Sequence, residues 1–182
     1  MDNNLLKYLS LSEFNQIKKE TNLIKKSFML VSILFKDKVD KNNEPYIKHL
    51  ITVSLKMSTY DGRVAGLLHD VVEDKDDVTF DDLIDIGIPN NIIEVLKLVT
   101  KKTYNDNISK SKKLELYNKE IDNIISSDNE LAIELKYSDM SNNYNIDRLK
   151  LLSSEKQRWL HLKYGENIKK LEKRMENKND RY

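Results

Sequence analysis

Apolar side chains recur at helical spacing along most of the chain. Between positions 12 and 38 they fall three, four or seven residues apart, as Phe14, Ile17, Ile24 and Phe28 illustrate, which predicts one or two helices. The same pattern predicts further helices over 46–57, 61–74, 79–86, 89–99, 114–125, 129–144 and 153–175. No segment alternates between apolar and polar residues as a half-buried strand does. The sequence therefore predicts an all-α protein of seven to nine helices without a sheet.

Capping residues indicate where several of these helices begin. Ser12 and Asp128 are expected N-caps, because their side-chain oxygens can accept the first free amide protons of a helix. Thr79 and Asp82 have the spacing of a capping box, and Pro89 is expected to open a helix. With only 4 Gly and 2 Pro in 182 residues, few positions break a helix, which favours long ones.

Composition narrows the class of protein. The 182 residues, 39% apolar and 34% charged, suit one soluble globular domain spanning 1–182. A net charge of +1 gives no global field that would favour nucleic acid or a membrane surface. The absence of Cys excludes disulfides, thiolate metal sites and a Cys nucleophile. The first residues do not have the pattern of a signal peptide, so we expect a cytoplasmic protein.

Segment 67–74 reads Leu-Leu-His-Asp-Val-Val-Glu-Asp and places ionisable groups inside an apolar run. At about 100° per residue, one face of a helix here would hold an imidazole and three carboxylates. These groups belong to His69, Asp70, Glu73 and Asp74. Such a face suits a divalent metal and a hydrolytic water. The alternative is a solvated acidic face, since more aspartates follow between 76 and 85.

Gly66 falls on the polar side of the same predicted helix. Its missing side chain is expected to leave room there for another group to approach.

Two other segments carry polar groups on apolar helices. His49 lies near the start of the helix predicted over 46–57, and Asp139 shares a helical face with Lys136 and Asn143. A lone buried His is more often a hydrogen-bonded core residue than a ligand, but a second His followed by Asp favours metal binding. The hypothetical ligands are His49, His69, Asp70 and Asp139.

Two neutral imidazoles and two carboxylates would balance the charge of one divalent ion. Nitrogen and oxygen ligands without sulfur suit Mn²⁺, Fe²⁺, Co²⁺ or Zn²⁺ better than Ca²⁺. Water bound to such an ion is acidified. Glu73 and Asp74, one turn further on, could orient that water, accept its proton or protonate a leaving group.

Taken in order, these residues resemble the HD phosphohydrolase superfamily. Within it, they look most like the branch of hydrolases that remove pyrophosphate from guanosine tetra- and pentaphosphate, (p)ppGpp, the signals of the stringent response. The motifs that carry the resemblance are Pro-Tyr-Ile-Lys-His at 45–49, Ala-Gly-Leu-Leu-His-Asp-Val-Val-Glu-Asp at 65–74, Val-Thr-Phe-Asp-Asp-Leu at 78–83, Leu-Val-Thr-Lys at 98–101 and Leu-Lys-Tyr-Ser-Asp through Asn at 135–143. The resemblance covers about 28–149, and 150–182 is expected to add a C-terminal helix.

The resemblance implies an HD-domain helical bundle and a role for each polar residue. His49, His69, Asp70 and Asp139 would bind the metal, usually Mn²⁺ in this branch. Glu73 and Asp74 would be the catalytic acids. The residues expected to contact the substrate are Lys101, Lys136 and Asn143.

The chain departs from the family pattern at several positions, and two of these departures, at Asp40 and Asn142, alter the nucleotide side. Asp40-Lys41 stands where the branch has Arg-Lys, and Phe35 and Asn142 stand where it has His. Leu50 replaces the Pro after the first His. No expected metal ligand or catalytic carboxylate is lost, so the reaction type is better defined than the substrate.

Several alternatives stay open at this point. The substrate could be another nucleotide phosphate, such as a nucleoside monophosphate, or the chain could be a non-catalytic nucleotide-binding regulatory module. A purely structural helical protein would leave the polar cluster unexplained. Trp159 and His161 are interpreted as packing or surface residues. The apolar stripe of the C-terminal helix could close the core or pair with a second copy.

Overall fold

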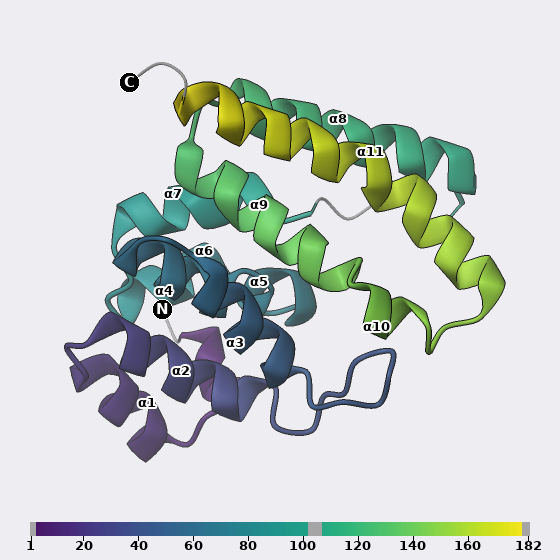
Figure 1. The fold of residues 1–182 in the computed structure, drawn as a ribbon. Coiled ribbons are helices and arrows are strands. Elements are labelled where there is room, and N and C mark those ends of the chain that lie inside the picture. The colour runs from purple at the N-terminus through teal and green to yellow at the C-terminus, as the bar shows by residue number, and fades with distance from the viewer. Residues whose placement is uncertain (1–2, 102–106, 180–182) are drawn as a thin grey trace. The chain divides into compact units, whose positions relative to one another are not determined.

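Helices account for the regular structure of the described residues, 3–101 and 107–179, in the computed structural model (Figure 1). These residues form no β-sheet, and an isolated bridge between Val39 and Pro45 is their only β-type pairing. The all-α prediction is therefore confirmed. The chain divides into two compact units, Met1–Thr100 and Lys101–Tyr182. That both belong to one domain stays a prediction.

In the first unit, α4 lies against three other helices. It contacts α2, α3 and α7, and α6 in turn contacts α7. The apolar side of α4 supplies the core, since Val64, Ala65 and Leu68 are fully or almost fully buried. The elements are η1 (Asn4–Lys7), α1 (Leu11–Lys19), α2 (Leu23–Leu34), α3 (Ile47–Lys56), α4 (Tyr60–Leu68), α5 (Val71–Asp74), α6 (Phe80–Asp85) and α7 (Asn90–Val99).

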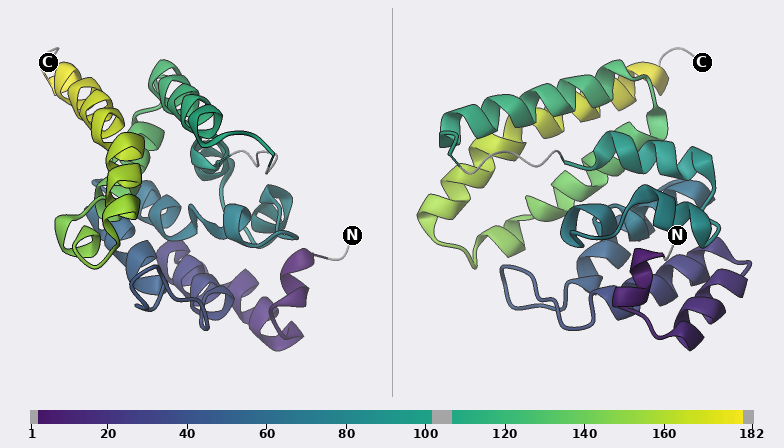
Figure 2. Two further views of the ribbon diagram at one scale, coloured as in Figure 1. Left: turned by 90° about the vertical axis from the view of Figure 1, so that its right-hand side faces the viewer. Right: turned by 180° about the vertical axis from the view of Figure 1, so that it is seen from behind.

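In the second unit, the long helix α11 packs against both α8 and α9 (Figures 1 and 2). Leu160, Tyr164 and Leu171 of the predicted apolar stripe are buried, so the stripe serves the core of this unit. Pairing with a second copy stays a prediction. The elements are α8 (Lys110–Ser126), α9 (Glu130–Asn143), α10 (Ile146–Leu149) and α11 (Ser154–Asn179).

Helix starts follow capping chemistry, although two predicted caps were one or two residues out of place. Ser10, not Ser12, caps α1, because Glu13 lies three residues later and completes a capping box with it. Asn129, not Asp128, caps α9. Asp128 instead adopts a left-handed backbone conformation, with φ of 52°, in the turn after α8.

Other predicted starts are confirmed. Thr79 and Asp82 form both hydrogen bonds of the expected capping box, and Pro89 precedes α7 directly. Most of the polar connection expected over 101–107 lies outside the described residues. Even the longest described helix lacks an apolar stretch sufficient to cross a membrane.

Lys26 is a buried lysine between two helices of the first unit. It lies on α2 with only 4% of its surface exposed. Its ammonium donates hydrogen bonds to the carbonyl of Ile86, just after α6, and to that of Lys18 at 3.4 Å. Burial lowers the pKa of Lys26, and the charge of Glu20 opposes that shift. The ammonium thus satisfies carbonyl groups that the ends of α1 and α6 leave without helical partners.

Candidate metal centre

The close contact between α3 and α4 depends on Gly66. A Cβ atom on this residue would lie 2.7 Å from Cα and 2.9 Å from the backbone nitrogen of Ser54 on α3. The prediction that Gly66 leaves room is right, but the backbone of α3 fills that room. Ser54 also donates a hydrogen bond from its hydroxyl to the carbonyl of Arg63 at 2.8 Å. These contacts hold α3, which carries His49, close to α4, which leads to His69.

The 67–74 motif does not lie on one continuous helix, as the sequence pattern predicted. Helix α4 ends at Leu68, His69 and Asp70 form a turn, and α5 begins at Val71. Asp70 has ψ of −1°, outside the helical value, which interrupts the regular helix. Side chains of adjacent residues on a regular helix do not face each other. The turn instead brings Nε2 of His69 within 3.1 Å of Oδ2 of Asp70.

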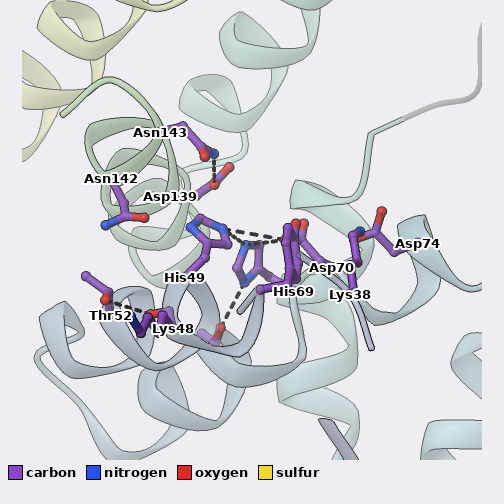
Figure 3. A network of polar contacts seen from close by, with 12 residues as sticks. Lys38, Lys48, His49, Thr52, His69, Asp70, Asp74, Asp139, Asn142 and Asn143 are labelled. Atoms are coloured by element: carbon purple, nitrogen blue, oxygen red, sulfur yellow. Dashed lines mark hydrogen bonds and ion pairs between the residues drawn. The ribbon is translucent and has the colours of Figure 1, made fainter. Parts of the chain in front are cut away.

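Three donor atoms converge at this turn, as Figure 3 shows. Nε2 of His49 lies 3.2 Å from Nε2 of His69 and 3.5 Å from Oδ2 of Asp70. Both histidines are buried, whereas Asp70 is partly exposed. Within the described residues, this is the one group of His, Asp and Glu side chains close enough together to hold a metal ion. Three of the four predicted ligands are thus brought together.

The spacing of the three donors fits a metal ion. Ligands about 2.1 Å from an ion lie about 3.0 Å apart at octahedral angles and about 3.4 Å apart at tetrahedral angles. The three donor separations, from 3.1 to 3.5 Å, lie in this interval or within about 0.1 Å of it. Nδ1 of His69 lies 2.8 Å from the carbonyl oxygen of Gly66, which can only accept a hydrogen bond. This contact places the proton of neutral His69 on Nδ1 and leaves the lone pair of Nε2 for a cation.

The Asp70 carboxylate is kept ionised by its neighbours. Without a metal ion, burial raises its pKa, but the charge of a protonated His69 and hydrogen bonds from His49 and His69 outweigh that effect and hold the pKa well below its usual range. A bound cation would take the place of these imidazole protons. The hydroxyl of Tyr46 also donates a hydrogen bond to Oδ2 of Asp70, at 2.5 Å. An ionised carboxylate beside two imidazoles is a donor set that a divalent cation would neutralise.

The two predicted catalytic acids lie on α5, directly after the donor group. Glu73 is exposed. Asp74 is partly buried, with its Oδ2 in an ion pair with Nζ of Lys38. The short helix thus carries one exposed carboxylate and one that is held against a cation.

The remaining predicted site residues belong to the second unit. On α9, Oδ1 of Asp139 accepts a hydrogen bond from Asn143 at 2.6 Å, and its Oδ2 lies 3.7 Å from Nζ of Lys136. These three residues share a helical face, as predicted. Lys101 is exposed. That Asp139 is a fourth metal ligand, and that Lys101, Lys136 and Asn143 contact a substrate, stay predictions.

Sequence reasoning missed Tyr46 and Lys38. Tyr46 lies three residues before His49, a spacing that could have suggested a shared face. Lys38 gave no local signal, because its partner Asp74 is far away in the sequence. In the second unit, Arg148 donates to the side chain of Asn142 at 2.6 Å, another unpredicted contact.

Comparison with known proteins adds no assignment: no protein-family model matches the chain, and no curated protein matches it.

Proposed function

We propose that this protein is a metal-dependent phosphohydrolase that acts on a nucleotide. The observation that carries the proposal is the convergence of His49, His69 and Asp70, with the carboxylates of Glu73 and Asp74 on the next helical turn. The order of motifs along the sequence, which resembles HD phosphohydrolases, supports the same conclusion.

We assign the metal as Mn²⁺, with Fe²⁺, Co²⁺ and Zn²⁺ as alternatives that the nitrogen and oxygen donors also suit. When bound, the ion would lower the pKa of a water molecule and offset the charge of a phosphate group. Asp139 is proposed as the fourth ligand, which would bring the protein's contribution to two imidazoles and two carboxylates.

Glu73 and Asp74 are the proposed catalytic residues. The exposed carboxylate of Glu73 can accept a proton from the attacking water. Asp74, held by Lys38, is proposed to orient the water and then to pass on to the leaving oxygen the proton that Glu73 takes from the water. Lys101, Lys136 and Asn143 are proposed to bind phosphate and ribose groups, since ammonium and amide groups donate hydrogen bonds to phosphate oxygens.

The proposed substrate is (p)ppGpp, hydrolysed at its 3′-pyrophosphate. Water would attack phosphorus, the bond between phosphorus and the 3′ oxygen would break, and pyrophosphate would leave as the 3′ hydroxyl gains a proton. The cytoplasm, where such nucleotides occur, is the proposed location. Because Asp40 and Asn142 differ from the family pattern, other nucleotide phosphates must be assayed as substrates beside (p)ppGpp.

Hydrolysis assays with added Mn²⁺, Co²⁺ or Mg²⁺ would test the proposal. The panel comprises guanosine tetraphosphate, guanosine pentaphosphate, and nucleoside mono- and triphosphates, with release of pyrophosphate and of phosphate measured separately. Pyrophosphate from the two alarmones alone is the expected result. Release of phosphate from a nucleoside monophosphate would support the proposed hydrolase activity but would show that the proposed substrate is wrong. Binding of a nucleotide without turnover of any compound would indicate a regulatory module instead.

A further inference from the structure

The segment between α2 and α3 forms a closed polar loop in the first unit. Its two ends are joined by a hydrogen bond from the backbone nitrogen of Tyr46 to the carbonyl of Lys38 at 2.9 Å. A second bond runs from the nitrogen of Asp40 to the carbonyl of Glu44 at 2.8 Å. The Asp40 carboxylate also accepts from the nitrogens of Asn42 and Glu44, at 2.8 and 3.0 Å. Lys38 and Tyr46 are therefore fixed side by side at the base of the loop.

Tyr46 contacts the donor group directly. Its hydroxyl bonds the same Asp70 oxygen, Oδ2, that faces both histidines. The Tyr46 ring packs against two others, with centroid separations of 5.4 Å to Phe35 and 5.5 Å to His49. Because these contacts restrict the ring, its hydroxyl can hold the Asp70 carboxylate in one orientation. One lone pair of Oδ2 accepts from Tyr46, which leaves the other for a cation.

Lys38 connects this tyrosine to the second acid. Its Nζ lies 3.9 Å from the centroid of the Tyr46 ring and forms an ion pair with Oδ2 of Asp74. A cation over the face of a phenol ring is attracted to its π electrons, so the ring helps to hold the ammonium in place. Through these contacts one loop reaches both Asp70, at the turn, and Asp74, on α5.

We propose that Tyr46 and Lys38 are positioning residues that act through different carboxylates. Tyr46 orients Asp70 for the metal, and Lys38, held over the Tyr46 ring, orients Asp74 for proton transfer. The loop between α2 and α3 therefore sets metal affinity and turnover through two separable contacts. The inference rests on the proposed function, because it takes His49, His69 and Asp70 as metal ligands and Asp74 as an acid.

Tyr46→Phe tests the first contact. The variant keeps the ring and its contacts with Phe35, His49 and Lys38 but removes the hydroxyl. Calorimetric titration of the metal-free variant with Mn²⁺ alone should give a dissociation constant about 10-fold or more above that of the wild type. The unfolding temperature of the metal-free variant should stay within a few degrees of the wild type, which separates positioning from a general loss of structure.

Lys38→Met tests the second contact. The dissociation constant for Mn²⁺ should change by less than about 3-fold, whereas kcat should fall about 10-fold or more, since outer contacts of a site typically have effects of this size. Lys38→Arg, which keeps a cation, should recover most of the turnover. Lys36→Met is the matched control, because the Lys36 side chain is 69% exposed and its ion pair with Asp37 is long, at 4.0 Å.

Each outcome separates this inference from the proposed function. Wild-type protein that binds no Mn²⁺ or other divalent ion would overturn the metal site itself. Wild-type protein that binds Mn²⁺, with equal affinity in Tyr46→Phe, would overturn only the role of Tyr46. Equal turnover in Lys38→Met and Lys36→Met, in a protein that hydrolyses nucleotides, would overturn only the role of Lys38.

Discussion

Gly66 and Ser54 meet backbone to backbone, so closely that a Cβ atom on Gly66 would lie 2.7 Å from Cα of Ser54. The same Gly66 accepts a hydrogen bond through its carbonyl from Nδ1 of His69. Gly66 thus determines how closely α3 approaches α4, and it also determines which nitrogen of His69 carries the proton. With the proton on Nδ1, the lone pair is on Nε2, the atom that lies near His49. Packing and site geometry are linked at this position.

Gly66→Ala should therefore destabilise the protein, although alanine is the better helix former. A backbone atom cannot move aside as a flexible side chain can, so the cost is expected to be about 1–3 kcal/mol. Urea denaturation followed by circular dichroism measures it. Gly165→Ala is the matched control, because a Cβ atom there would only make ordinary contact, at 3.5 Å, with the His161 side chain. That variant should gain about 0.5–1 kcal/mol, and a similar gain in Gly66→Ala would contradict the close contact.

Metal binding should stabilise the folded protein through the histidine pair. Free metal at 100 times its dissociation constant contributes about 2.7 kcal/mol, and a chelator should remove that contribution. Thermal unfolding with Mn²⁺ and with EDTA should therefore differ in the wild type but not in His69→Ala. His161→Ala, which loses the exposed imidazole bonded to Tyr144, should respond to the metal as the wild type does. A metal response in His69→Ala would count against the assigned ligands.

Asp139→Asn tests the fourth ligand. The amide can still accept the hydrogen bond from Asn143 through its oxygen, but it lacks the charge that a metal ligand supplies. We expect Mn²⁺ affinity to fall about 10-fold or more, with turnover reduced in parallel at limiting metal. Calorimetric titration with Mn²⁺ measures this change. An unchanged affinity would mean that Asp139 is not a ligand and that His49, His69 and Asp70 are the protein ligands of the metal.

Glu73→Gln should separate chemistry from metal binding. The side chain is exposed and is assigned to the proton of the attacking water, so Mn²⁺ affinity should be retained. Loss of a general base typically lowers kcat by about 10²- to 10⁴-fold. Parallel measurement of metal content and nucleotide hydrolysis distinguishes the two effects. Loss of the metal in this variant would mean that Glu73 is a ligand and that the roles are wrongly divided.

The all-helical fold could be predicted because the longer helices repeat their apolar pattern over many residues, as α11 does with Leu160, Tyr164 and Leu171. The meeting of His49, His69 and Asp70 was inferred from residue types and a family resemblance rather than from geometry. The turn at His69 and Asp70 was missed, because helical periodicity runs through it without a Gly or Pro to mark a break. The partner of Gly66 was missed because it lies on another helix.

Asp82 is expected to make stability depend on pH. Burial raises its pKa, but hydrogen bonds from Asn4 and Thr79 outweigh that effect, so the pKa is lowered in the folded protein. A lowered carboxyl pKa contributes stability above the unfolded value of about 3.9, and that contribution is lost as pH falls through the folded value. Unfolding free energy should therefore decline below about pH 4 in the wild type and less steeply in Asp82→Asn.

Asp81→Asn is the matched control for this titration. Asp81 is exposed in the same first turn of α6, and it should contribute only a few tenths of a kcal/mol through the helix dipole. Its urea-denaturation profile between pH 3 and pH 7 should follow that of the wild type. Identical acid profiles for Asp82→Asn and the wild type would contradict the role of the hydrogen bonds at Asp82.

The buried ammonium of Lys26 gives the molecule an internal chemical reporter. Acylating reagents need an accessible, unprotonated amine, and the Lys26 side chain on α2 is buried with its donors directed at carbonyl groups at the ends of α1 and α6. Lysines in solvent acquire the label from the native state, whereas Lys26 acquires it only while these helices are apart. The rate at which Lys26 is labelled therefore measures how often the helices of the first unit separate. The chain has no cysteine, so a buried thiol cannot serve for the same measurement.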